Sequence, residues 1–141
     1  QGSGDGTGAQ AEFNEPFDLA LSPDSAYVYV ADKNNHRIRK VSASTGEVTT
    51  IAGSSQGSAD GTGTSATFQK PRGISVNPDG KTALICDASN GLIRKIDLTT
   101  TEVTTLAGNG NSFQDGVGTI ARFNNPRGIV IAPDGDTAYI A

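Results

Sequence analysis

The residues of this chain that could do chemistry are few. It has one histidine, His36, and one cysteine, Cys86. A serine or cysteine nucleophile needs a neighbouring base, and a catalytic zinc ion usually needs about three protein ligands. Neither arrangement can be assembled around a single imidazole. The sequence therefore predicts no catalytic residues, no metal site and no cofactor, and it predicts that Cys86 is a small buried residue within an apolar stretch.

Two arginines are the candidate ligand-binding residues. Arg72 and Arg127 each lie between a proline and a glycine, directly before a short apolar run. The guanidinium group binds carboxylates and phosphates through paired hydrogen bonds, so these positions suit an anionic ligand. The alternative, which we favour, is that each arginine forms an ion pair with a neighbouring part of the fold.

An aspartate within a glycine-rich turn occurs three times, at Asp5, Asp60 and Asp115. Such a turn suggests calcium, but Ca²⁺ prefers about six to eight oxygen ligands, and each turn offers one carboxylate. We therefore predict that these aspartates form Asx turns, which stabilise a crossing between structural units.

These residues recur because the chain is a tandem repeat. The three aspartates are spaced by 55 residues, which divides the chain into units 5–59 and 60–114 and an incomplete unit 115–141. A period of this size predicts a stacked or ringed array, in which each unit buries its apolar face on the next. The chain contains no methionine, and we interpret residues 1–141 as a segment of one longer repeat domain. The same step relates three further sets of residues: Ala11, Ala66 and Ala121; Phe13, Phe68 and Phe123; Pro16, Pro71 and Pro126.

Each unit is predicted to contain four strands. In the first unit they centre on residues 19–21, 27–31, 37–41 and 47–51. The first two are apolar and the last two are polar on one face, and a Pro-Asp-Gly turn in the second unit, Pro78-Asp79-Gly80, marks a hairpin. A four-stranded unit that grades from buried to exposed is typical of a β-propeller blade, and a solenoid is the alternative. The repeated phenylalanines are predicted to be buried between blades.

The repeated residues resemble the NHL repeat, which is named for its Asn-His-Leu residues. The resemblance rests on Pro71-Arg72-Gly73-Ile74, Pro78-Asp79-Gly80, Asp87, Asn90 and Ile93-Arg94, and on Asn35-His36 in the first unit. It covers essentially the whole chain and implies an all-β fold: a β-propeller of four-stranded blades, of which about two and a half are present. NHL propellers include protein-binding platforms, RNA readers and a zinc-dependent lyase.

The amino-acid composition disfavours some of these functions. The net charge is −4 and the isoelectric point is near 4.8, which disfavours nucleic acid as a partner. No apolar run approaches the ~20 residues of a membrane-spanning helix. Low lysine content and abundant glycine, serine and threonine favour an extracellular or cell-surface location.

The sequence thus predicts a non-enzymatic structural or interaction module, part of a larger protein, that binds protein or glycan surfaces at one mouth of the propeller. Further blades of the same chain, or other copies, would close the ring. One alternative is a subunit of a self-assembling ring or filament, because an incomplete ring leaves a bare blade face and a free strand edge. Another is part of an enzyme or RNA-binding propeller whose key residues lie outside this segment.

Overall fold

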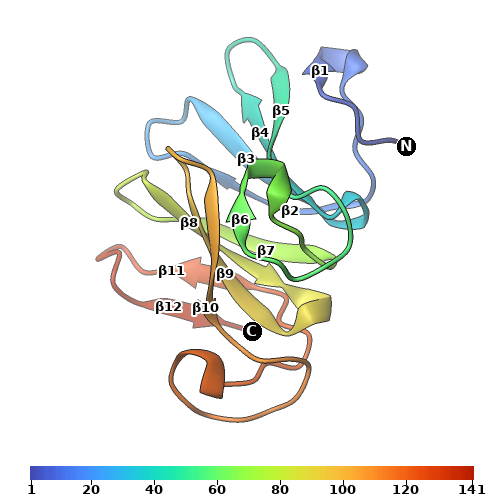
Figure 1. Cartoon of the computed structure of the whole chain (residues 1–141). Helices are drawn as coiled ribbons and strands as arrows, with labels where there is room; N and C mark the ends of the chain where they lie inside the picture. Colours follow the sequence, from blue (N-terminus) through green and yellow to red (C-terminus); the bar gives the residue numbers. More distant parts are fainter.

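The chain folds into three successive antiparallel sheets, and the computed structural model describes all residues 1–141 (Figure 1). The first sheet has the order β1-β5-β4-β3-β2, the second β6-β10-β9-β8-β7, and the third is the hairpin β11-β12. The strands are β1 (Gly6–Thr7), β2 (Pro16–Leu21), β3 (Tyr27–Asp32), β4 (Arg37–Ser42), β5 (Glu47–Ala52), β6 (Gly61–Thr62), β7 (Pro71–Val76), β8 (Thr82–Asp87), β9 (Leu92–Asp97), β10 (Glu102–Ala107), β11 (Ile129–Ile131) and β12 (Ala138–Ile140).

The three sheets form a fan with their first long strands on the inside. Strand β7 lies beside β2 on one side and beside β11 on the other, so these inner strands converge. Within each of the two larger sheets the chain then runs outward, and consecutive strands pair antiparallel. Figure 1 follows this progression from the blue end of the chain to the red end. The arrangement confirms the prediction of a partial β-propeller.

The two larger sheets each have a fifth strand that the predicted four-stranded blade lacked. It is only two residues long and comes from the segment that precedes the inner strand. Gly6 pairs with Val48 on β5, and Gly61 pairs with Val103 on β10. The connecting segment therefore leaves one sheet, lines the outer edge of the next, and only then enters its inner strand. This pairing covers an edge that would otherwise be open.

The short connections follow the predicted turn chemistry. Gly80 has a φ of 72° and donates its N–H to the carbonyl of Asn77 at 2.8 Å, which closes the hairpin between β7 and β8. Five 3₁₀ turns occur: η1 (Gly8–Gln10), η2 (Lys33–Asn35), η3 (Gly63–Ser65), η4 (Ala88–Asn90) and η5 (Gly118–Ile120). Left-handed residues end η2 and η4, with φ of 58° at His36 and 64° at Gly91.

The core lies between the first and second sheets. Tyr29, Ala31 and Ile38 of the first sheet pack in one cluster with Ile74 and Ile85 of the second. The connecting segment contributes Ala66 and Phe68 to the same cluster, both with no exposed surface. Burial of such side chains is the main source of stability in an array of this kind.

The repeated phenylalanines differ in burial. Phe68 is fully buried between the first two sheets, as predicted. Phe13 and Phe123 are only half-buried, so the prediction was wrong for these two. Within residues 1–141 no sheet packs on the side of the first sheet where Phe13 lies, and Phe123 lines an open cavity beside β12. Cys86 is fully buried, as predicted.

Candidate functional site

The inner strands begin at one end of the fan, at Pro16, Pro71 and Pro126, and we call this end the proline mouth. The residue before each proline, Glu15, Lys70 or Asn125, is left-handed, with φ of 55°, 55° and 57°. This conformation is unusual for a non-glycine residue, and more so before proline. The backbone is thus the same in all three units while the side chains differ, so a fixed framework presents variable groups at this mouth.

Phe17, Arg72 and Asn125 bring the three sheets together at the proline mouth. The Arg72 Cζ atom lies 5.4 Å from the centre of the Phe17 ring, within the range of a cation–π contact. Arg72 Nη1 donates a hydrogen bond to Asn125 Oδ1 at 3.2 Å. Its Nε is buried without a partner, and its Nη2 donates to no protein atom. Phe17 itself remains 48% exposed.

Arg127 lies next to this cluster. A Cβ atom added to Gly73 would stand 2.5 Å from the Arg127 carbonyl oxygen, so the backbone of the third sheet approaches the residue after Arg72 very closely. The Arg127 side chain is exposed. The structure therefore brings the two sequence-predicted arginines to the same mouth, and their role in ligand binding stays a prediction.

The ion pair favoured for these arginines in the sequence was not found. Neither arginine lies within salt-bridge distance of a carboxylate. Arg72 does cross between sheets, but it contacts an amide and an aromatic ring. Two acidic residues of the same mouth, Glu15 and Asp18, already have other partners. Glu15 binds Lys33 Nζ at 2.8 Å, and Asp18 accepts the backbone N–H groups of Leu19 and Ile74.

His36 also belongs to the proline mouth. Its Nδ1 accepts the backbone N–H of Lys70 at 3.1 Å, which joins the η2 turn of the first sheet to the start of β7. Burial, assisted by the positive charge of Lys70, lowers the pKa of His36 below 6.5. The Lys70 ammonium forms no ion pair and its side chain extends at the exposed rim.

Opposite the proline mouth, the β2–β3 and equivalent hairpins form what we call the hairpin mouth. Its turns carry Asp24, Asp79, Asp134 and Asp136. Several of these carboxylates accept turn backbone N–H groups, such as Lys81 N to Asp79 at 2.8 Å. The two mouths therefore differ in charge: the hairpin mouth is acidic, and the proline mouth holds arginines without acidic partners.

Two arginines that the sequence placed on solvated strands are the largest fully buried side chains of the fold. Arg39 on β4 contacts Asp32 at 2.8 Å and Asp5 at 2.7 Å, and Arg94 on β9 contacts Asp87 at 3.0 Å and Asp60 at 2.8 Å. The sequence left these arginines to pair with Asp32 and Asp87 or with solvent, and it did not predict their complete burial. We call each set an arginine clamp, because the guanidinium also binds carbonyl groups of the connecting segment, such as Thr67 O at 3.0 Å.

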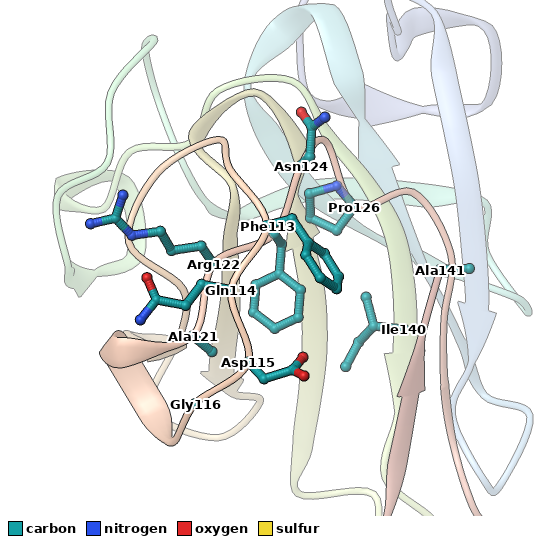
Figure 2. A pocket seen from close by; sticks show the side chains of 11 residues that line it. Phe113, Gln114, Asp115, Gly116, Ala121, Arg122, Asn124, Pro126, Ile140 and Ala141 are labelled. Carbon is teal, nitrogen blue, oxygen red and sulfur yellow. The ribbon is translucent and has the colours of Figure 1, made fainter.

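The clamps correct the prediction made for the repeated aspartates. Asp5 accepts bonds from Thr50 N, Thr50 Oγ1 and Arg39, and Asp60 from Thr105 Oγ1 and Arg94, so neither forms an Asx turn. Burial raises the pKa of Asp87, against the hydrogen bonds from Asn90, Gln69 N and Arg94. Asp115 has no arginine partner and faces a cavity of about 330 Å³ between Phe113 and Ile140 (Figure 2).

The remaining reactive groups are the single thiol and the possible metal ligands. The Cys86 thiol contacts the Gly128 carbonyl at 3.6 Å, and burial, followed by the negative charge of Asp18, raises the pKa of that thiol to about 12, so it stays protonated at neutral pH. No three histidine, cysteine, aspartate or glutamate side chains are grouped as metal ligands. No helix has the length and apolar character that a membrane crossing requires.

Known proteins are similar to this chain in sequence. No family model matches the chain. It is 32% identical over 139 residues to protein SUPPRESSOR OF QUENCHING 1, chloroplastic, of Arabidopsis thaliana, a match that spans 91% of this chain. It is 31% identical over 107 residues, or 74% of the chain, to human NHL repeat-containing protein 2. The chain spans only 13% and 15% of the length of these two relatives.

Solved structures agree with the fold. An auxiliary nutrient binding protein from Bacteroides thetaiotaomicron superimposes with a TM-score of 0.78 at 26% identity, over 88% of this chain and 34% of that one. Hydrazine synthase from Kuenenia stuttgartiensis gives a TM-score of 0.67 at 25% identity, over 96% and 31%. The converging inner strands and outward-running sheets define a segment of a β-propeller. The chain belongs to the NHL-repeat family of these propellers.

Proposed function

We propose that this segment is a non-enzymatic interaction module of a larger protein, and that it binds protein or glycan surfaces through the proline mouth. The observation that carries the proposal is the contrast within the repeat. Framework positions such as Phe13, Phe68 and Phe123 are identical in every unit, whereas the residue before each mouth proline is different in each unit and the residue after it changes from phenylalanine in the first unit to arginine in the other two. Side chains that vary on one repeated backbone are free of the packing constraints of the fold and are available for recognition.

The chemistry of the mouth also supports binding rather than catalysis. An exposed aromatic ring beside arginines is the composition found at the energetic centres of protein interfaces. The only imidazole in the chain, on His36, accepts a backbone hydrogen bond at Nδ1, and the only thiol, on Cys86, is buried. The structurally similar protein from Bacteroides thetaiotaomicron is itself described as a nutrient binding protein.

A capture experiment with matched variants tests the proposal. The chain would be immobilised in three forms: unchanged, with Arg72→Glu and Arg127→Glu at the proline mouth, and with Asp79→Lys and Asp134→Lys at the hairpin mouth. Partners that the unchanged chain and the hairpin-mouth variant retain, and the proline-mouth variant loses, support the proposal. Glycan-array binding with the same three forms distinguishes glycan from protein. Retention by all three forms would contradict it.

A second candidate function is self-assembly, and a specific observation favours it. Leu19 and Leu21 on β2 are 60% and 55% exposed, and Tyr139 on β12 is 65% exposed. At the first sheet-to-sheet contact, the counterpart of Leu19, Ile74, is only 3% exposed. A second copy could therefore cover Leu19 as the first sheet covers Ile74. Sedimentation should then show oligomers that Leu19→Asp abolishes; a monomer at high concentration would exclude them.

An extracellular or cell-surface setting is proposed for the larger protein. Its support is compositional: the chain is poor in lysine and rich in glycine, serine and threonine. One similar protein carries the word chloroplastic in its name, so the fold itself does not dictate the compartment. Immunodetection of the full-length protein in secreted and cellular fractions tests this point, and recovery only from inside cells would contradict it.

A further inference from the structure

Two arginines at the proline mouth, Arg72 and Arg127, carry charges that no carboxylate of the chain neutralises. Arg37 and Arg122 also lack a carboxylate partner, but Arg37 donates to the Ser3 carbonyl and Arg122 lies on the segment before the third sheet. The charges of Arg39 and Arg94 are neutralised by aspartates in the buried clamps. Lys33 is paired with Glu15. Arg72 and Arg127 have no carboxylate within 4.0 Å, and Lys70 forms no ion pair either. The pKa of Glu15 is lowered mainly by Lys33, and the charge of Lys70 is only a minor cause.

We infer that the proline mouth recognises a short acidic peptide segment, whose carboxylates bind Arg72 and Arg127 and whose adjacent apolar side chain packs on Phe17. The inference rests on the proposed binding function of this mouth and names its ligand class. Phe17 lies on β2 and Arg72 on β7, and Arg127 lies two residues before β11 at the same end of the fan.

Arg72 is held ready for such a ligand. Its guanidinium lies 5.4 Å from the centre of the Phe17 ring and is hydrogen-bonded to Asn125 Oδ1 at 3.2 Å, so much of its conformational freedom is already lost. Its Nη2 donates to no protein atom. A carboxylate oxygen can take this donor, and a guanidinium fixed in advance binds with a smaller entropic loss.

Phe17 adds an apolar requirement. Its ring is 48% exposed although Arg72 lies on it and Lys33 Nζ stands 5.9 Å from its centre. The free part of the ring offers apolar area directly beside the guanidinium. A ligand with a leucine or phenylalanine next to an acidic residue would satisfy both groups at once.

The charge distribution favours a short acidic segment over a polyanion. The chain carries a net charge of −4, and the opposite mouth holds four aspartates at its turns, Asp24, Asp79, Asp134 and Asp136. A nucleic acid presents one phosphate at every nucleotide and needs a basic stripe to neutralise it. Two arginines and one lysine match the charge of two or three carboxylates instead.

The probe is the fluorescein-labelled peptide Glu-Phe-Glu-Leu-Glu, blocked at its C-terminus, and its matched control is Gln-Phe-Gln-Leu-Gln. Fluorescence anisotropy with the whole 141-residue chain should show saturable binding of the acidic peptide, and binding of the glutamine peptide about tenfold weaker or absent. A labelled 12-nucleotide RNA should bind more weakly than the acidic peptide.

Three variants locate the site. Arg127→Gln removes an exposed side chain that forms no hydrogen bond or ion pair within the chain, and Arg72→Gln removes the ordered guanidinium. Each should weaken the acidic peptide about tenfold, because each removes a charge-assisted bond. Lys81→Gln at the hairpin mouth is the control and should change affinity less than twofold. Circular dichroism confirms that each variant is folded.

The outcomes separate this inference from the proposed function. If both peptides bind equally and Phe17→Ala abolishes that binding, the ligand is not recognised by its acidic groups. The proline mouth would then still be a binding surface. Stronger binding of the RNA, or loss of binding in Lys81→Gln as large as in Arg127→Gln, would also overturn it. If neither peptide binds but a partner is captured at the proline mouth, the inference fails while the proposed function stands.

Discussion

The guanidinium of Arg94 lies 3.0 Å from the carboxylate of Asp87, and both side chains are completely buried. The same relationship holds between Arg39 and Asp32 one repeat earlier, at 2.8 Å. Each arginine also holds the connecting segment, through Asp60 in the second sheet and Asp5 in the first. Each of the two complete sheets therefore buries an arginine–aspartate ion pair. The same arginine also binds the connecting segment that precedes the inner strand of its sheet.

Breaking one clamp should destabilise the chain strongly. Arg94→Met leaves the buried Asp87 carboxylate without a counter-charge, although Asn90 and Gln69 N still donate to it, so the free energy of unfolding should fall by about 3–5 kcal/mol. Urea denaturation measures the change. Lys95→Met, at the exposed neighbouring position, is the matched control and should stay within about 0.5 kcal/mol of the parent. A loss below 1 kcal/mol in Arg94→Met would show that the clamp is dispensable.

The architecture could be predicted because repetition is visible along the chain, but the clamps could not. A charged residue within a strand normally indicates a solvated face, and Arg39 and Arg94 each stand directly before a lysine, Lys40 or Lys95. Their neutralising carboxylates come from the end of the preceding strand, seven residues earlier, and from a segment 34 residues earlier. Local periodicity cannot report such distant partners. The one available signal was that aspartates and arginines recur together at the same step.

The candidate site was predicted in part for a related reason. The exchange of Phe17 for Arg72 and Arg127 at one repeat position could be read directly from the sequence. The stacking of Arg72 on Phe17, the bond to Asn125 and the contact of His36 with Lys70 all cross between sheets. They depend on how far each sheet is rotated from the last, and no residue pattern within one unit encodes that rotation.

The buried phenylalanine of the connecting segment should carry much of the packing energy between the first two sheets. Phe68→Ala creates a cavity where the side chain now has no exposed surface, so we expect a loss of about 3–5 kcal/mol. Phe113→Ala is the control, because that ring is 84% exposed, and it should change stability by less than about 0.5 kcal/mol. Similar losses for the two variants in thermal or urea unfolding would show that the packing is assigned wrongly.

Asp60 should make stability depend on acid. Burial alone would raise the pKa of Asp60, but the hydrogen bonds from Thr105 and Arg94 outweigh it and lower the pKa below 3.8. The unfolded chain therefore takes up the proton first as the pH falls, and the stabilisation present above about pH 4 is lost as the pH falls through the folded-state value. Urea unfolding from pH 2.5 to 5 should show a shallower pH dependence in Asp60→Asn.

The matched control for this prediction is Asp115→Asn, at the same position of the third unit. The Asp115 carboxylate has no arginine partner, so this variant should keep the pH dependence of the parent. A dependence that flattens equally in Asp115→Asn and in Asp60→Asn would mean that the bonds to Arg94 and Thr105 are not its cause.

His36 should add a second pH dependence, near neutrality, at the proline mouth. Burial lowers the pKa of His36 below 6.5, and the charge of Lys70 lowers it further. The unfolded chain therefore binds a proton at a higher pH than the folded chain does. Protonation of Nδ1 would also remove the acceptor for Lys70 N–H. The stability contribution is complete above about pH 6.5 and should decline as the pH falls below that value.

His36→Gly is the appropriate variant because Gly91 occupies the same left-handed position one repeat later. Between pH 5 and 7.5 the urea midpoint of the parent should rise with pH more steeply than that of the variant, whatever the absolute difference between them. Because His36 is the sole histidine, NMR titration of its ring gives the folded-state pKa directly. A measured value at or above 6.5 would mean that the His36–Lys70 contact does not favour the neutral imidazole.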